Sequence, residues 1–193
     1  MRRPIKDQMV ERIQYQPPKG VTPSIILVNP KHAHNAGMVV RLASCFGFKQ
    51  VWFTGNRITE DLEVSKRLPR EERMKGYKEV DIINYDYPFD AFGPDVIPIA
   101  IEVRPQAELL HQFEHPENAV YVFGPEDGSI PTSLIRHCHR FVVIPTKHCL
   151  NLATAATAIL WDRTSKLGGP FYTPGEFEQR GFAAAVPDLT GHW

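Results

Sequence analysis

The sequence has few cysteines and no long apolar run. It has three cysteines, Cys45, Cys138 and Cys149, which are widely spaced and odd in number. They therefore cannot form a disulfide framework, and at least one thiol stays free. No stretch is apolar enough to span a bilayer, and the start MRRPIKDQM lacks the apolar run of a signal peptide. We expect a soluble protein, with no membrane partner, in the reducing cytoplasm.

Two further absences limit the kinds of partner. The 22 basic residues balance the 22 acidic ones, so a nucleic acid would have to be held by a local basic patch. Neither a GxGxxG nor a P-loop pattern occurs, so ordinary dinucleotide or nucleoside triphosphate binding has no support. Apolar content of 42% and charged content of 23% are ordinary for a packed domain in a chain of 193 residues.

Short apolar runs alternate with helical patterns along the chain. Apolar residues recur at spacings of three and four between Met38 and Phe46, which predicts a helix after a loop, and the Ala-rich stretch from Leu152 to Lys166 predicts another. The strand candidates are Ser24 to Asn29, Gln50 to Thr54, Glu79 to Asn84, Val96 to Val103, Ala119 to Phe123 and Phe141 to Ile144. This alternation predicts an α/β domain with a mainly parallel sheet.

The composition changes towards both ends and once in between. Residues 1–23 mix charges with Pro17, Pro18, Gly20 and Pro23, which predicts an extended arm outside the core, and residues 168–193 lack periodicity, which predicts a tail that docks on a surface or stays mobile. We therefore place the domain at residues 24–167. The segment from Glu63 to Lys78 holds six basic residues against three acidic ones, and it is either a solvated helical face or a phosphate-binding patch.

Three loops that follow predicted strands carry polar side chains: KHAHNAG, GPEDGSIP and PTKHCLN. In open α/β sheets, ligands bind where loops leave the carboxyl ends of strands, so we expect these loops to meet. Gly124 and Gly128 flank Glu126 and Asp127, which permits close backbone approach to a ligand, or simply a tight turn into a helix at Pro131.

Metal binding and nucleophilic catalysis are weaker alternatives for the His and Cys residues. The stretch RHCHR, with His148 and Cys149 further on, contains side chains that zinc accepts. Adjacent residues of a strand or helix point in different directions, so we expect no metal site. Cys149 paired with a histidine could act as a nucleophile, but no protease or hydrolase signature supports that role.

Taken together, the three loops resemble the SpoU/TrmH branch of the SPOUT RNA methyltransferases. The matching motifs are NAGMVVRLASCFGF (Asn35 to Phe48), VFGPEDGSIP (Val122 to Pro131) and IPTKHCLNLATAATAIL (Ile144 to Leu160), and their order and spacing also match. The resemblance covers about residues 24–166. It implies a parallel sheet with helices on both faces, a deep C-terminal trefoil knot, S-adenosylmethionine as cofactor and an obligate homodimer.

The resemblance also implies roles for individual residues. Asn35 and Arg41 match the catalytic asparagine and arginine of the family. The residues expected to hold the cofactor are Ile101, Glu102, Gly124, Glu126, Gly128, Ile144, Cys149, Leu150 and Asn151. The third motif usually reads Ser-Leu-Asn, and a thiol at Cys149 is a weaker hydrogen-bonding group than a hydroxyl.

The implied reaction is transfer of a methyl group to a ribose 2′-hydroxyl of RNA, with tRNA as the expected substrate. We interpret Arg41 as a fixed positive charge and not as the base, because guanidinium deprotonation in a protein is very costly. His32 and His34 either accept the proton or face solvent or RNA. Two alternatives are a non-enzymatic RNA-binding dimer of the same fold and a methyltransferase that acts on a base nitrogen.

The expected RNA contacts lie outside the three motifs. Phosphate groups would bind the basic run from Lys66 to Lys78 together with Arg2 and Arg3, which confers affinity but little sequence choice. In the stretch YDYPF, three aromatic residues either stack on unpaired bases or pack on the core. These residues are Tyr85, Tyr87 and Phe89.

Overall fold

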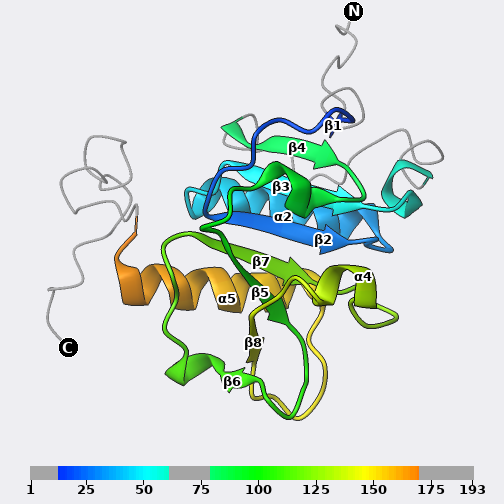
Figure 1. Cartoon of the computed structure of the whole chain (residues 1–193). Coiled ribbons are helices and arrows are strands. Elements are labelled where there is room, and N and C mark those ends of the chain that lie inside the picture. Colours follow the sequence, from blue (N-terminus) through cyan, green and yellow to red (C-terminus); the bar gives the residue numbers. More distant parts are fainter. Residues whose placement is uncertain (1–12, 61–78, 170–193) are drawn as a thin grey trace, which may run out of the picture.

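The fold is built on one sheet in which every strand pair is parallel (Figure 1). The computed structural model describes residues 13–60 and 79–169. Within these residues the strand order is β1-β4-β3-β2-β7-β5-β8-β6. The strands are β1 (Ile13–Gln14), β2 (Ser24–Val28), β3 (Gln50–Thr54), β4 (Asp81–Asn84), β5 (Ile97–Ile101), β6 (Glu108–Leu109), β7 (Ala119–Phe123) and β8 (Arg140–Val143). Because all strands run the same way, all their carboxyl ends lie at one edge.

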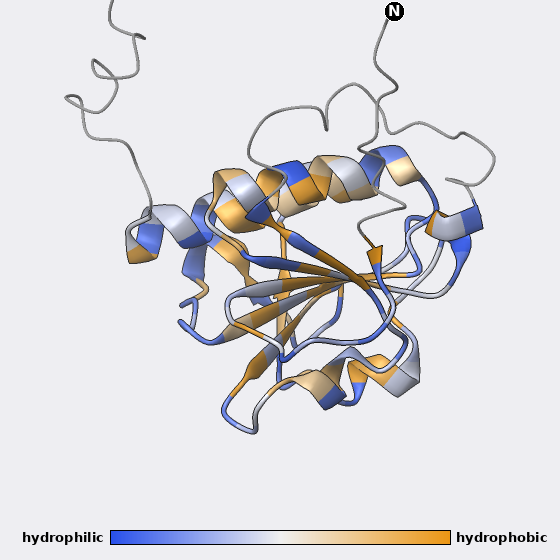
Figure 2. Ribbon diagram, turned by 90° about the horizontal axis from the view of Figure 1, so that it is seen from above, coloured by the Kyte–Doolittle hydropathy of each residue, from blue (hydrophilic) through white to orange (hydrophobic). Residues whose placement is uncertain are grey.

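Helices cover both faces of the sheet. The long helices α2 (Ala33–Cys45) and α5 (Leu152–Leu167) pack on one face, and the short helix α4 (Thr132–Ile135) and the 3-10 turn η3 (Pro88–Ala91) pack on the other. A second 3-10 turn, η4 (Leu110–Gln112), follows β6. Figure 2 shows the apolar strands as a layer between these two sets of helical segments. The expected α/β fold with helices on both faces is therefore confirmed.

The central strands form the core because they are apolar on both faces. All five residues of β2, β3 and β7 are buried. Alternate side chains point to opposite faces, so Ile25 and Leu27 pack with α2 and α5, whereas Ile26 and Val28 pack with α4. A parallel sheet covered on both faces requires such uninterrupted apolar runs.

All six predicted strands and both long helices are present, but three details differ from the predictions. Helix α2 begins at Ala33, ahead of the expected Met38, so Asn35 lies in its first turn and not in a loop. The prediction that residues 1–23 lie outside the core is wrong at β1, because Ile13 is only 7% exposed and β1 pairs with β4. Strand β6 was not predicted, since two residues are too few to form a recognisable pattern.

Several predicted features lie outside the described residues. These are Arg2 and Arg3, the basic run from Lys66 to Lys78, and the tail beyond residue 169. The trefoil knot stays a prediction. In the part of the chain that is described, no helix combines the length and the apolar character that crossing a bilayer requires.

Candidate functional site

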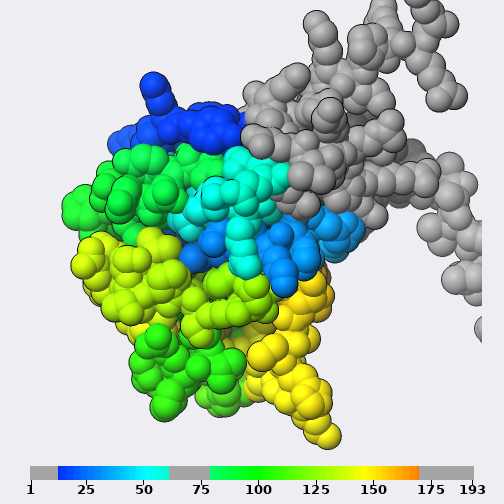
Figure 3. Space-filling model, turned by 90° about the vertical axis from the view of Figure 1, so that its right-hand side faces the viewer, coloured from blue at the N-terminus to red at the C-terminus, as the bar shows by residue number. Residues whose placement is uncertain are grey.

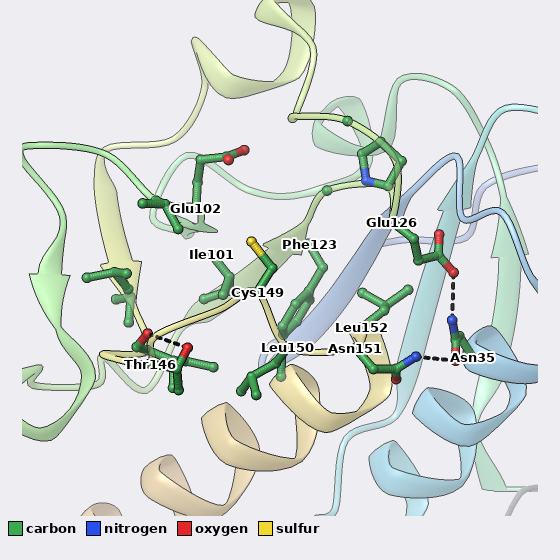
Figure 4. A pocket seen from close by; sticks show the side chains of 18 of the residues that line it. Asn35, Ile101, Glu102, Phe123, Glu126, Thr146, Cys149, Leu150, Asn151 and Leu152 are labelled. Atoms are coloured by element: carbon green, nitrogen blue, oxygen red, sulfur yellow. Dashed lines mark hydrogen bonds between the residues drawn. The ribbon is translucent and has the colours of Figure 1, made fainter.

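A pocket of about 540 Å³ opens at the carboxyl ends of β2, β5, β7 and β8 (Figure 4). It collects the loops that follow three of these strands, and the first turn of α2. All nine residues predicted to hold a cofactor line it, namely Ile101, Glu102, Gly124, Glu126, Gly128, Ile144, Cys149, Leu150 and Asn151. Asn35 and His32 also line the pocket, whereas Arg41 and His34 are not among its lining residues.

The sheet topology explains why the pocket lies at this edge. Strands β2 and β7 are neighbours, but the chain leaves β2 through α2 on one face and leaves β7 through α4 on the other. Where neighbouring connections diverge in this way, a crevice is left outside the carboxyl ends of the strands. Asn35 after β2 and Glu126 after β7 face each other across this crevice.

Three polar side chains, one from each motif, are joined by hydrogen bonds. Asn35 is only 6% exposed, and its Nδ2 donates to Glu126 Oε1 over 2.8 Å. Asn151 Nδ2 donates to Asn35 Oδ1 over 3.0 Å. Asn151 also caps α5, because its Oδ1 accepts from the backbone N–H groups of Ala153 and Thr154. Residues far apart in the sequence thus hold one another in place beside the pocket.

The electrostatic state of Glu126 follows from its hydrogen bonds. Partial burial would raise the pKa of the Glu126 carboxyl, but donation from Asn35 Nδ2 and from the backbone N–H groups of Lys31 and His32 outweighs it, and the pKa lies below its ordinary value. The bond from Lys31 N to Glu126 Oε2 is 2.7 Å long. Glu126 therefore stays ionised and acts only as an acceptor.

An ion pair beside the pocket ties in the segment after β3, which becomes helical at Arg57. Arg57 donates two hydrogen bonds to Asp127, from Nη1 over 2.9 Å and from Nη2 over 2.6 Å, and Nη1 also lies 3.4 Å from the carbonyl oxygen of Asn29. The Arg57 guanidinium holds the pKa of Asp127 well below its usual range. Arg57 was not predicted as a site residue, although it lies just after a predicted strand, which is the signal that identified the three loops.

The lining of the pocket suits a small organic cation with an apolar ring. Its apolar side chains include Ile101, Phe123 and Leu150, and its charged side chains include the carboxylates of Glu102 and Glu126. Among the described lining residues there is no Lys or Arg. Glu102 Oε2 accepts from the backbone N–H of Ile130 over 3.1 Å, which holds this carboxylate in place. The volume lies within the range of about 300 to 1,000 Å³ that is typical of ligand sites.

The side chain of Cys149 points towards the middle of the pocket (Figure 4). By the family resemblance a serine is expected at this position of the motif, so a thiol stands there in place of a hydroxyl. The loop that carries it is braced by Thr146, whose Oγ1 donates to the carbonyl oxygen of His148 over 2.8 Å. Within residues 13–60 and 79–169, no three His, Cys, Asp or Glu side chains are grouped so as to hold a metal ion.

The three aromatic residues of YDYPF divide between the two interpretations. Phe89 packs on the sheet and stacks with His137, with ring centroids 5.0 Å apart. Tyr85 is half-buried against the same core cluster. Tyr87 is 68% exposed, so it alone of the three presents most of its surface to solvent.

Comparisons with known proteins agree with this geometry. The model of the family described as the SpoU rRNA Methylase family matches residues 23–161. The chain is 29% identical over 155 residues to a tRNA (cytidine-2′-O-)-methyltransferase, TrmJ, of Methanocaldococcus jannaschii, a match that covers 74% of this chain and 67% of the relative.

Solved structures share the fold at low sequence identity. The A. aeolicus TrmH/SpoU tRNA modifying enzyme matches with a TM-score of 0.63 and 16% identity, over 88% of this chain and 93% of that one. An AdoMet-bound rRNA methyltransferase from Sinorhizobium meliloti matches with a TM-score of 0.61 and 17% identity, and the match covers 80% of this chain and 62% of that one. A structure concerned with the 2-OH methylation of C/U34 on tRNA matches with a TM-score of 0.61 and 22% identity, and the match covers 75% of this chain and 95% of that one.

Proposed function

Because this chain belongs to the SpoU rRNA Methylase family, we propose that it transfers a methyl group from S-adenosylmethionine to a ribose 2′-hydroxyl of tRNA. The observation that carries the proposal is the joining of Asn35, Glu126 and Asn151 beside a pocket that all nine expected cofactor residues line. The similarity to a tRNA (cytidine-2′-O-)-methyltransferase supports tRNA as the substrate. We assign this activity to a domain spanning residues 24–167.

S-adenosylmethionine fits the chemistry of the pocket. The cofactor carries a positive sulfonium and an adenine ring, and when bound it supplies an electrophilic methyl group. Ile101, Phe123 and Leu150 offer apolar surface for the ring, and the carboxylates of Glu102 and Glu126 favour a cation. Gly124 and Gly128 leave room for backbone contacts with the ligand.

Asn35 and Glu126 position the ribose in this proposal. Methyl transfer needs the attacking oxygen in line with the methyl group, so accurate placement supplies most of the rate. The ionised Glu126 and the capping Asn151 hold the Asn35 amide from both ends, and Asn35 is then preorganised to bind the ribose. Of the two candidate histidines, His32 lines the pocket and is our candidate to accept the proton released by the hydroxyl.

Arg41 requires a different explanation, because it does not line the pocket of its own chain. It follows Asn35 by six residues on α2, which at about 100° per residue turns it to another side of the helix. A homodimer, as the family resemblance implies, would give Arg41 of one subunit a route to the pocket of the other. There its fixed charge would bind a phosphate and stabilise the developing alkoxide.

Labelled S-adenosylmethionine tests the proposed reaction. The protein is incubated with total RNA and with purified tRNA, and the RNA is digested to nucleosides. We expect label in a 2′-O-methyl nucleoside from tRNA. Label in a base would favour the base-nitrogen alternative, and RNA binding without transfer would favour the non-enzymatic dimer.

Mixed variants test the role of Arg41 and the homodimer together. Arg41→Ala and Asn35→Ala should each be inactive with cofactor affinity nearly intact, as measured by calorimetry. If Arg41 acts on the partner's pocket, refolding equal amounts of the two variants together should restore about a quarter of the active sites, because half of the dimers are mixed and each mixed dimer has one complete site. A mixture as inactive as each variant alone would contradict action across the interface.

A further inference from the structure

A second pocket, of about 320 Å³, lies at the carboxyl ends of β1, β3 and β4. Its aromatic lining residues are Tyr15, Tyr85 and Tyr87, and the others are Gly55, Asn56, Thr59, Asn84 and Asp86. We call it the tyrosine pocket. These residues come from segments that follow β1, β3 and β4, or end β4, and the corresponding dark blue, cyan and green regions adjoin on the face seen in Figure 3. The three motifs contribute nothing to it.

The rings of the tyrosine pocket offer surface for stacking. Tyr87 is 68% exposed and Tyr15 is 57% exposed, which is unusual for large aromatic side chains. Tyr85 and Tyr87 meet edge to face with ring centroids 6.2 Å apart. Tyr85 is anchored in the core, so it supports the outer ring from one side.

The polar groups of the pocket fit a nucleobase better than a phosphate. Among its described lining residues there is no Lys or Arg, and Asp86 carries a negative charge. Asn56 and Asn84 carry side-chain amides, which can pair with the polar edges of a base. Asp86 Oδ1 accepts from the backbone N–H of Gly55 over 2.7 Å, which joins the segments after β3 and β4 and shapes the pocket.

The tyrosine pocket lies at the same edge of the sheet as Asn35 and Glu126. Strand β4 is two strands from β2, about 10 Å at the usual spacing of neighbouring strands. Arg57 stands between the two pockets, since its neighbour Asn56 lines one and its partner Asp127 adjoins Glu126 in the other. An RNA whose ribose reaches Asn35 therefore brings a nearby nucleotide to the tyrosines.

We propose that the tyrosine pocket binds an unpaired base next to the methylated nucleotide, stacked on Tyr87. This inference rests on the proposed function for the identity of the RNA, but it concerns a different set of residues. Single-stranded bases stack on aromatic rings with little dependence on their identity. The site therefore selects RNA in which a base close to the target is unpaired.

Binding of fluorescein-labelled tRNA, measured by anisotropy, tests the base site without requiring catalysis. Tyr87→Ala should raise the Kd for tRNA about tenfold, the usual effect of removing one stacking ring. Tyr87→Phe, which keeps the ring, should hold the tRNA more tightly than Tyr87→Ala does. Leu167→Ala is the matched control, because Leu167 is also exposed but ends α5, about 24 Å along the helix from Asn151. Equal Kd values for Tyr87→Ala and the unaltered protein would overturn the proposal.

Abasic substitution identifies the base that stacks. In a tRNA transcript that the protein methylates, removal of the stacked base should weaken binding to the unaltered protein about tenfold, and should weaken binding to Tyr87→Ala no further. Independent losses at every position would contradict a shared contact. Absence of methyl transfer by the unaltered protein would contradict the proposed function instead, because the anisotropy result does not depend on transfer.

Discussion

The pocket that the nine expected cofactor residues line, called here the cofactor pocket, shares one edge of the sheet with the tyrosine pocket but is built in a different way. In the cofactor pocket, Asn35 is buried and both ends of its amide are held by hydrogen bonds. In the tyrosine pocket, Tyr15 and Tyr87 are mostly exposed. Chemistry that depends on placing two atoms in line needs the first design, whereas stacking on a flat ring tolerates the second. Under the two proposals above, the buried amide sets the rate and the exposed rings select the RNA.

Glu126→Ala should have the largest effect, because it removes the carboxylate that holds Asn35 in the cofactor pocket. Loss of the acceptor for Asn35 Nδ2 and Lys31 N frees the amide that positions the ribose. We expect the rate constant for methyl transfer, measured in single-turnover assays, to fall about 100-fold or more with the Kd for tRNA unchanged. Glu126→Gln retains one acceptor oxygen and should lose less. Equal rates for Glu126→Ala and the unaltered protein would show that Asn35 needs no anchor.

Arg57→Ala should have a smaller effect, because it disconnects the two pockets and leaves each one formed. Without the two hydrogen bonds to Asp127, the helical segment that begins at Arg57 is no longer tied to the loop that carries Glu126. We expect kcat/KM for tRNA to fall about tenfold, with little change in cofactor affinity. The double variant Arg57→Ala/Asp127→Ala should be no worse than either single variant. Additive losses would mean that the two side chains act separately.

Cys149→Ser should alter only the cofactor pocket, and modestly. A hydroxyl is a stronger hydrogen-bonding group than a thiol, and Cys149 points towards the middle of the pocket. We expect kcat/KM for S-adenosylmethionine to stay constant or to rise by up to about fivefold, the worth of one net hydrogen bond. Cys149→Ala serves as the control without either group. A large loss in Cys149→Ser alone would show that the thiol has its own task.

His115 lines neither pocket, so its titration should change only the stability of the fold. Burial lowers the pKa of His115 more than the hydrogen bond to Asp162 raises it. As the pH falls, the imidazole of His115 is therefore protonated in the unfolded chain before it is protonated in the folded one. Its contribution to the free energy of unfolding is complete above about pH 6.5 and is lost as the pH falls below that value. Urea unfolding between pH 5 and 8 measures this loss. His115→Gln, which does not titrate, should be less sensitive to acid.

The motifs predicted the membership of the cofactor pocket but not its connections. Short apolar runs located all six predicted strands, since buried parallel strands read as continuous apolar runs. Asn35, Glu126 and Asn151 were matched through the family resemblance, yet which atom donates to which could not be read from the sequence. The structure places Asn35 in the first turn of α2, where the helix backbone fixes its direction.

The tyrosine pocket and Arg57 show where sequence patterns carry too little information. Arg57 and Asp127 are 70 residues apart, and one charged residue after a strand has no period that could reveal its partner. Strand β1, which precedes Tyr15, has two residues, so pairing with β4 decides its conformation more than its own composition. Contacts between separate segments are set by packing and not by local preference.

The hydrogen bonds around Asn35 all run in one direction, which has a consequence for how the site forms. Donors lead from the amino end of α5 to Asn151, from Asn151 to Asn35, and from Asn35 to Glu126. Rotating either amide by half a turn would set oxygen against oxygen at one of its ends and N–H against N–H at the other. The series can therefore be assembled only as a whole, and its sense is dictated by a helix end that cannot reverse.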